Sequence, residues 1–375
     1  MAKILILGGG FGGLVAARRL ALSLGPSHDI TLVAPNQKFT FYPALVHLAF
    51  GECSVDDISF DLASTTKELG IRFVQGEMIR IYAERRTVEI VGNDFNGELG
   101  YDYLIFAMGR RLATEKVPGF FEHAQHLLGV KAALKFGDLV RDFHAGRIIV
   151  GMCPDSRLPV PVCETAFALA RKFEPEMRDG RIRVSVIFPE SLEAAFGGAN
   201  LHKELEAAFE RHRINVLYDI PISEISFNEV YSSKKHKIEC DLLMLVPPFR
   251  GHAVLRPLGI TDDSDFVRVD GLMRVHGLER TYAVGDIVAF SGPKFAHMAV
   301  GQAEGAAANI LAEIKGEEPK TEYYHEIATI IDAGGADSIF LHYGIWDSSM
   351  LSLKKGRFWG WAKDAHDAFW RTRNK

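Results

Sequence analysis

Residues 3–20 decide the fold of this chain and read KILILGGGFGGLVAARRL. The first five positions are mostly apolar, which predicts a short strand, and residues 14–20 open a helix. Between the two lies the pattern G-x-G-x-x-G. This order of strand, glycine loop and helix is typical of a dinucleotide-binding unit, because bare backbone amides can approach phosphates there. We therefore predict a cofactor-binding set of Gly8, Gly10, Phe11, Gly12 and Gly13.

A second strand is predicted at residues 28–33, at the distance expected in such a unit. The position after this strand usually holds an acid that binds a ribose. Ala34 occupies it here, and we take Asn36 or Lys38 as the residue that contacts the ribose or adenine end instead.

Two later segments indicate which dinucleotide is bound. Residues 101–109, YDYLIFAMG, resemble a flavoprotein strand that ends in Ala-Thr-Gly beside the cofactor, with methionine in place of threonine. Residues 281–286, TYAVGD, resemble the late strand whose Gly-Asp pair holds the ribityl and phosphate region of FAD. Either segment alone is equally an ordinary buried strand before a turn. Because three such segments occur in order, we predict FAD, with further contacts from Ala107, Met108, Gly109, Gly285 and Asp286.

A second glycine loop, which would bind a nicotinamide dinucleotide, is not found. Residues 151–164 read GMCPDSRLPVPVCE, so side chains and three prolines follow Gly151. Proline has no N–H to donate to a phosphate. The electron donor is therefore predicted not to be NAD(P)H, and the two cysteines in this loop favour sulfur chemistry.

Composition sets the broad class. The chain has 375 residues, of which 47% are hydrophobic, and a net charge of −5, which predicts a globular protein of two or three domains and no nucleic-acid partner. It enters its first strand at Lys3 and has no apolar run of 18 residues, so we expect neither a signal peptide nor a transmembrane helix. Its cysteines and histidines lack zinc-like spacing, and no metal site is expected.

The order of motifs predicts an α/β fold with two Rossmann-like dinucleotide-binding domains. The FAD domain is discontinuous, with one part at residues 1–112 and another at 251–318. Residues 113–250 form the second Rossmann-like domain, with strands at 147–150 and 181–188 and helices at 164–170 and near 201–211. Residues 319–375 form a C-terminal region that associates with membranes.

This arrangement resembles the flavoprotein family that includes sulfide:quinone oxidoreductases and type II NADH:quinone dehydrogenases, over nearly the whole chain. Residues 241–251, DLLMLVPPFRG, and residues 292–299, GPKFAHMA, are similar to the sulfide side of that family. The resemblance implies that Lys294 places a positive charge near the pyrimidine end of reduced flavin; the alternative is a solvated loop lysine. It also implies that Pro43 is adjacent to the cofactor. His47 and His297 lie in these cofactor-adjacent segments, and we expect both to be packing residues.

The thiols depart from the family pattern. The resemblance implies one redox cysteine in the second-domain loop and another in a late segment, but residues 327–335 contain none. Cys153 and Cys163 remain as candidates, alone or as a local pair. Cys163 precedes a predicted helix, whose N-terminus would lower the thiol pKa unless the thiol is buried; the alternative is a small buried hydrophobe. We assign that alternative to Cys53 and Cys240.

Glu164 occupies the place of the family glutamate at the start of the same helix. A carboxyl in a partly apolar cleft can relay protons between flavin and quinone. The alternative is that an acid in the first turn simply stabilises the helix.

The C-terminal segment is basic and aromatic. All four tryptophans (346, 359, 361 and 370) lie in the final thirty residues, and an apolar stripe runs through positions 358, 361, 362, 365, 368 and 369 at helical spacing. From Lys354 onward seven basic residues face two acidic ones, so this segment carries +5 and the rest of the chain −10. Such a helix favours a membrane interface. The alternatives are docking on the protein's own core or a dimer interface.

The sequence thus predicts a peripheral FAD oxidoreductase at the cytoplasmic face of a membrane. Electrons pass from sulfide, or a related sulfur donor, through a disulfide or persulfide involving Cys163, with or without Cys153, to FAD and then to a quinone. A homo-oligomer is expected. The alternatives are a type II NADH:quinone dehydrogenase with an unorthodox nucleotide loop, and a non-catalytic flavoprotein that serves as a redox sensor or assembly partner.

Overall fold

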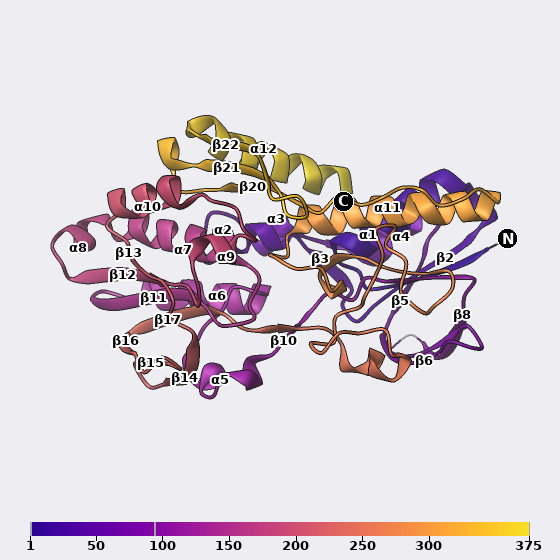
Figure 1. Ribbon diagram of the computed structural model, residues 1–375, viewed down its shortest axis with the longest axis horizontal. Coiled ribbons are helices and arrows are strands. Elements are labelled where there is room, and N and C mark those ends of the chain that lie inside the picture. The colour runs from indigo at the N-terminus through magenta and orange to yellow at the C-terminus, as the bar shows by residue number, and fades with distance from the viewer. Residues whose placement is uncertain (1, 94, 375) are drawn as a thin grey trace.

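The computed structural model describes residues 2–93 and 95–374 and contains two sheets of parallel strands (Figure 1). The first sheet has the order β19-β9-β1-β2-β5, and all neighbouring strands in it run parallel. Its strands are β19 (Thr281–Ala283), β9 (Tyr103–Phe106), β1 (Lys3–Leu7), β2 (Asp29–Ala34) and β5 (Arg72–Gln75). Residues 281–283 therefore return to the sheet that the N-terminus began, as the discontinuous arrangement predicts.

The second sheet is also parallel and lies beside the first along the long axis of the molecule (Figure 1). Its order is β13-β12-β11-β17, from strands β13 (Asn215–Leu217), β12 (Ile182–Ile187), β11 (Gly146–Met152) and β17 (Leu242–Val246). All five residues of β17 are buried, as are the last five of β11. Continuous apolar strands of this kind need covering on both faces, which is why helices alternate with them.

Helices cover the two sheets and join their cores. Near the first sheet α1 (Phe11–Leu24) packs along α11 (Ala296–Lys315), and both are rich in alanine, which permits a close approach. The second sheet is covered by helices that include α6 (Val130–Arg141), α7 (Pro159–Lys172) and α10 (His202–Arg211). Shorter helices are α2 (Leu45–Ala49), α3 (Val55–Ile58), α4 (Leu62–Glu68), α5 (Phe120–His123), α8 (Glu174–Arg178) and α9 (Leu192–Ala195).

Small antiparallel sheets complete the architecture. Among the described residues, three of them have three strands and two have two strands. They comprise β6 (Glu77–Tyr82), β7 (Thr87–Val91) and β8 (Asn96–Gly100); β14 (Ile222–Ser226), β15 (Glu229–Ser232) and β16 (Lys237–Glu239); β20 (Glu326–Ile331), β21 (Ile339–Gly344) and β22 (Ser349–Lys355); β3 (Lys38–Thr40) and β4 (Ser59–Asp61); and β10 (Arg111–Leu112) and β18 (Phe249–Arg250).

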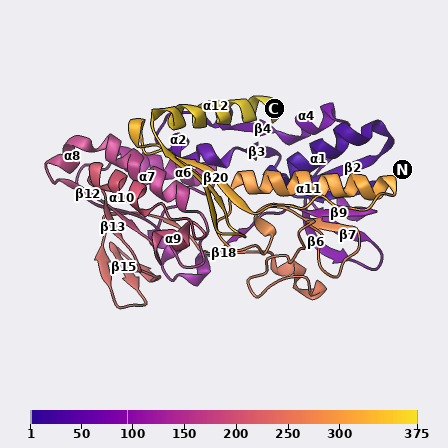
Figure 2. The same ribbon diagram turned by 45° about the horizontal axis from the view of Figure 1, so that its top comes forward.

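The chain ends in α12 (Arg357–Asn374), which directly follows the β20–β22 sheet. In both views this helix lies over the region between the two large sheets (Figures 1 and 2). Lys375 and the side chain of Arg373, two of the seven basic residues counted above, lie outside the described residues. Among the helices that are described, none has the length and apolar character to cross a bilayer.

Candidate active site

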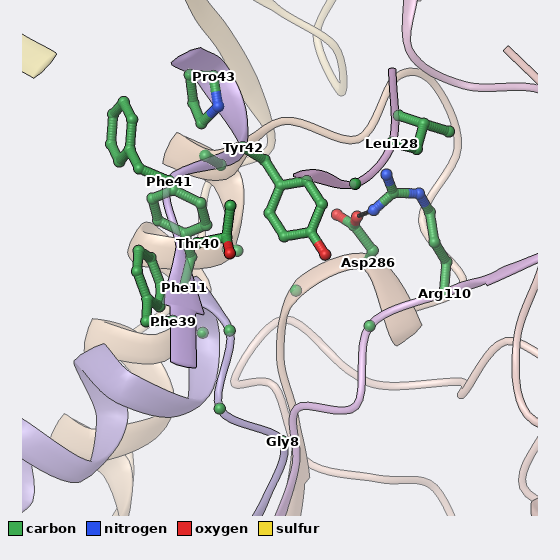
Figure 3. Close-up of a pocket in the computed structure, with 18 of the residues that line it drawn as sticks. Gly8, Phe11, Phe39, Thr40, Phe41, Tyr42, Pro43, Arg110, Leu128 and Asp286 are labelled. Atoms are coloured by element: carbon green, nitrogen blue, oxygen red, sulfur yellow. Dashed lines mark hydrogen bonds and ion pairs between the residues drawn. The ribbon is translucent and has the colours of Figure 1, made fainter. Parts of the chain in front are cut away.

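A cavity of about 1850 Å³ opens beside the first glycine loop (Figure 3). Its wall contains nearly every residue that the sequence predicts for the cofactor. These are Gly8, Gly10, Phe11, Gly12, Ala34, Asn36, Lys38, Pro43, Ala107, Met108, Gly109, Gly285, Asp286 and Lys294. Most of them follow strands of the first sheet, where parallel strands present their carboxyl ends to a ligand. The structure therefore brings these predicted residues together in one cavity.

The glycine loop fits a dinucleotide phosphate. Gly8 has a φ of +118°, and a Cβ added to it would lie 2.1 Å from the carbonyl oxygen of Ala107, so only glycine is tolerated. Gly10 is the N-cap of α1 and has open space around it, and no side chain caps the helix. The first amides of α1 are thus left for an anionic ligand. Gly13 does not line the cavity; an added Cβ there would meet the Gly8 oxygen at 1.8 Å.

An ion pair borders the cavity beside the predicted Gly-Asp segment. Arg110 donates to Asp286 from the loop after β9, and its guanidinium lies over the Phe249 ring at 4.3 Å (Figure 3). Both partners line the cavity. The sequence predicts Asp286 but misses Arg110, although its position directly after Gly109 is a usable signal.

Lys294 is buried in the cavity wall rather than solvated in a loop. Its Nζ donates to the carbonyl oxygen of Val288 at 2.6 Å and lies 4.8 Å from the ring centroid of Phe266. Burial lowers the pKa of Lys294 to about 7, although Asp286 acts in the opposite direction. The amine is therefore poised between its charged and neutral forms near neutral pH.

A buried ion pair from two distant helices forms another part of the wall. Glu164 of α7 accepts from Nζ of Lys363 on α12 at 2.5 Å and from the backbone N–H of Asp332 at 2.9 Å. Both charged side chains are buried and line the cavity. Burial is the largest single effect and would lower the pKa of Lys363, but Glu164, together with Asp367 and Asp332, raises it above its usual value. Glu164 therefore does more than stabilise its own helix.

The two loop cysteines do not reach this cavity. In the described part of the chain Cys153 and Cys163 are free thiols, both fully buried, and neither lines the wall. They also belong to different apolar clusters. The helix α7 begins at Pro159, four residues before Cys163, so this thiol lies beyond the first turn. Burial, with a smaller effect of Glu164, raises the pKa of Cys163, and burial raises that of Cys153. The lowering of the Cys163 pKa was predicted only for an unburied thiol, and that condition is not met.

The second loop is folded onto the protein itself. The amide of Cys153 donates to the carbonyl oxygen of Val246 at 2.9 Å, and that of Ser156 donates to Cys153 at 3.2 Å. The carbonyl oxygen of Arg157 accepts from the Lys294 amide at 2.8 Å. Prolines 159 and 161 then occupy the first turn of α7, where proline is tolerated because the amides there lack helical partners. Two amides of this loop thus bond within the protein, and its three prolines have no N–H to offer a second dinucleotide phosphate.

Comparison with known proteins agrees with this geometry. Residues 2–151 match the family model described as pyridine nucleotide-disulphide oxidoreductase. This match covers less than half of the chain. The protein is an oxidoreductase with FAD as its cofactor.

Two relatives match the oxidoreductase over most of their length. The sulfide-quinone reductase of Aquifex aeolicus is 25% identical, and the match covers 100% of this chain and 92% of that protein. The type II NADH:quinone oxidoreductase of Staphylococcus aureus is 21% identical, with 91% and 90% covered. The crystal structure of the sulfide:quinone oxidoreductase from Aquifex aeolicus superposes with a TM-score of 0.91 at 23% identity, covering 100% of this chain and 92% of that one, which shows the shared fold.

Of the two histidines that the sequence singles out, His297 lines the cavity and His47 does not. Nε2 of His297 accepts from the amide of Ala328 at 3.0 Å, and burial lowers the pKa of His297 to about 4. His47 pairs with Glu52 at 2.5 Å away from the cavity wall. The residues that the sequence misses come instead from the C-terminal helix, because Lys363, His366, Asp367 and Trp370 all line the cavity.

Proposed function

We propose that this oxidoreductase passes two electrons from sulfide, or a related small sulfur donor, through FAD to a quinone. The observation that carries the proposal is the second loop, in which the amides of Cys153 and Ser156 bond within the protein and the helix starts with prolines, which have no N–H. A nicotinamide dinucleotide would need those amides for its pyrophosphate. One relative that matches the full chain is a sulfide-quinone reductase, which supports a sulfur donor.

The proposed half-reactions balance without any thiol of the protein. Two hydrosulfide ions lose two electrons and one proton to give hydrogen disulfide ion, HS₂⁻, and a quinone takes up two electrons and two protons to give the quinol. FAD, when bound, accepts an electron pair from one substrate and yields it to the other. The proposed redox roles of Cys163 and Cys153 stay predictions, and the burial of both thiols favours a donor that acts on the flavin without them.

The Glu164–Lys363 pair is proposed to serve the quinone. Around it the wall is apolar, with Phe340, Ile330 and Val160 facing the same cavity. A quinone ring fits such walls, and the ammonium of Lys363 holds a proton that a developing quinol oxygen would accept. Glu164 would keep that ammonium charged and in position.

Attachment to the cytoplasmic face of a membrane is part of the proposal. On α12 the side chains of Phe358, Trp361 and Phe369 are 60%, 67% and 63% exposed. We call these three residues the outer face. Its aromatics, next to the basic residues of the C-terminal segment, suit a membrane interface, from which a quinone would reach the cavity.

Anaerobic titration of the purified yellow protein tests the donor. We expect sulfide to bleach the flavin absorbance and a quinone to restore it, whereas NADH leaves the spectrum unchanged. Bleaching by NADH alone would assign the protein to the type II dehydrogenases. If neither donor acts and no quinone is reduced, a non-catalytic flavoprotein is the better description.

The thiols are tested in the same titration. In Cys163→Ser and in Cys153→Ser, sulfide should reduce the flavin at a rate within about twofold of that in the unmodified protein, because neither thiol lines the cavity. Loss of sulfide-driven reduction with FAD still bound would reinstate that thiol as the redox residue. Cys53→Ser, which also lies outside the cavity wall, is the matched control.

A further inference from the structure

The inner side of α12 reaches both ends of the FAD cavity. Near its middle Lys363 bonds to Glu164 of α7, beside the second sheet. Near its end Trp370 packs against Phe11, Phe39 and Phe41, with ring centroids 4.7, 5.3 and 5.3 Å away. Phe11 belongs to the glycine loop itself, and Figure 3 shows the three phenylalanines gathered at one side of the cavity. Trp370 lines the cavity as well.

Further contacts fix the end of the helix to the N-terminal half of the chain. The guanidinium of Arg371 donates to the carbonyl oxygen of Asp57, at 2.8 Å, in the α3 segment. The helix therefore spans the cavity from α7 to the glycine loop. FAD could not leave past this wall without separating Trp370 from the phenylalanine cluster.

The outer face of the same helix points away from these contacts. The two faces differ in chemistry, since the inner side carries Lys363, Asp367 and Arg371 while the outer face is aromatic. The C-terminal segment carries +5, so two copies brought together through this face would repel each other. An anionic lipid surface would bury the aromatic side chains and attract the positive charge of the segment.

We propose that α12 is a strap over the FAD cavity, and that an anionic membrane bound to its outer face slows the release of FAD. This inference rests on the membrane attachment proposed above. An 18-residue helix that leaves its docking site is marginally stable in water. A membrane that holds the helix formed, with its inner side turned toward the protein, favours the closed state.

Release of FAD from the full-length holoprotein tests the strap, and it is followed by the fluorescence of free flavin after dilution. We expect anionic phosphatidylserine vesicles to slow release by roughly tenfold, whereas neutral phosphatidylcholine vesicles have a smaller effect. In solution Trp370→Ala should speed release by roughly tenfold or more, because a packed aromatic is lost. Trp361→Ala is the matched control: it should release FAD like the unmodified protein in solution but lose the vesicle effect.

Several outcomes would overturn the strap. Equal release from Trp370→Ala and the unmodified protein would do so, as would vesicles that bind in a sedimentation assay but leave release unchanged or faster. Release that slows with protein concentration alone would mean that a second copy, not lipid, covers the outer face. Circular dichroism and the Trp370→Phe variant, which should keep most of the retention, separate lost folding from a lost contact. If vesicles do not bind at all, the proposed membrane attachment fails, and the strap's response to lipid fails with it.

Discussion

Lys363 and Glu164 form a pair that neither helix can supply alone. The two positions are 199 residues apart, and both side chains are buried in a wall that is largely apolar. Burying a single charge costs desolvation free energy, and a hydrogen-bonded partner of opposite charge offsets much of that cost. The extra bond from the Asp332 amide satisfies the same carboxylate oxygen. The pair therefore stabilises the closed position of α12 only while both members are present.

A double-mutant cycle checks this dependence. Lys363→Met should lower the free energy of unfolding by about 3–5 kcal/mol, because it leaves a buried carboxylate without its cation. The double variant Glu164→Gln/Lys363→Met should recover much of that loss, since both charges are gone. Urea unfolding of the holoprotein measures each value. The exposed Lys320→Met should stay within about 0.5 kcal/mol, and additive losses in the double variant would show that the pair is not coupled.

Lys294 makes a pH-dependent prediction for the flavin potential. Its lowered pKa of about 7 means that its charge is present below pH 7 and is lost as the pH rises through that value. A cation beside reduced, anionic flavin raises the reduction potential. At pH 6 we expect Lys294→Met to have a midpoint potential lower by about 20–60 mV, which corresponds to about 1–3 kcal/mol for two electrons.

The difference in midpoint potential between the unmodified protein and Lys294→Met should become smaller above pH 7, because Lys294 then also lacks its charge. Spectroelectrochemical titration at several pH values measures both potentials. Equal potentials at pH 6 would place Lys294 away from the electron-accepting part of the flavin. Lys38→Met, at another part of the cavity wall, is the matched control.

At the scale of elements, sequence patterns predict secondary structure correctly where interactions between neighbouring residues determine it. The predicted strand at residues 3–7 is β1, and the strands predicted at 147–150 and 181–188 fall on β11 and β12. The start of α7 was missed because its prolines were interpreted only as lost donors, although proline also favours a helix start. The burial of Cys163 follows from the packing of α7 and could not be inferred from its neighbours in sequence.

For the C-terminal helix, too, the local pattern was predicted correctly and the contacts with distant residues were not. Periodicity correctly predicts a helix with an apolar stripe, and positions 358, 361, 365, 368 and 369 of that stripe are exposed. The sequence treats docking on the protein and binding to a membrane as alternatives. In the structure the inner side docks on the protein and the apolar stripe is left exposed, because the docked residues, among them Lys363 and Trp370, lie outside the stripe. A search for apolar residues at helical spacing does not find polar residues on the inner side of the helix.

The outer face yields a prediction for membrane binding. The triple variant Phe358→Ser/Trp361→Ser/Phe369→Ser should bind anionic vesicles at least about a hundredfold more weakly, because each buried aromatic contributes about 1.5–3 kcal/mol. Raising the salt concentration from 0.1 to 0.5 M should weaken binding of the unmodified protein, since screening reduces the attraction of its basic residues. Vesicle sedimentation measures both effects. Phe121→Ser, on exposed α5, is the control, and an equal loss in it would remove the outer face as the binding surface.

At the scale of the whole molecule, one cavity joins parts that the chain order keeps apart. Its wall contains residues of the glycine loop, of α7, of the β20–β21 sheet and of α12. A cofactor bound there would lie against loops of the first sheet and against α7, which packs on the second sheet, so its binding energy would add to the stability of the whole arrangement. The dinucleotide is therefore expected to act as part of the core as well as a redox group.

Removal of FAD should consequently lower the melting temperature. With free FAD at a thousand times its dissociation constant, binding adds about 4 kcal/mol, and we expect a difference of at least about 4 °C between holo- and apoprotein by calorimetry. Gly10→Ala separates cofactor contact from folding, because a Cβ there meets no protein atom within 4 Å but projects at the N-cap of α1. The apo form of Gly10→Ala should have the melting temperature of the unmodified apoprotein, but FAD should no longer raise that temperature. Gly271→Ala, equally open but away from the cavity, should keep the full increase. An undiminished increase in Gly10→Ala would place the FAD phosphates elsewhere, since a methyl group against a bound phosphate must weaken binding.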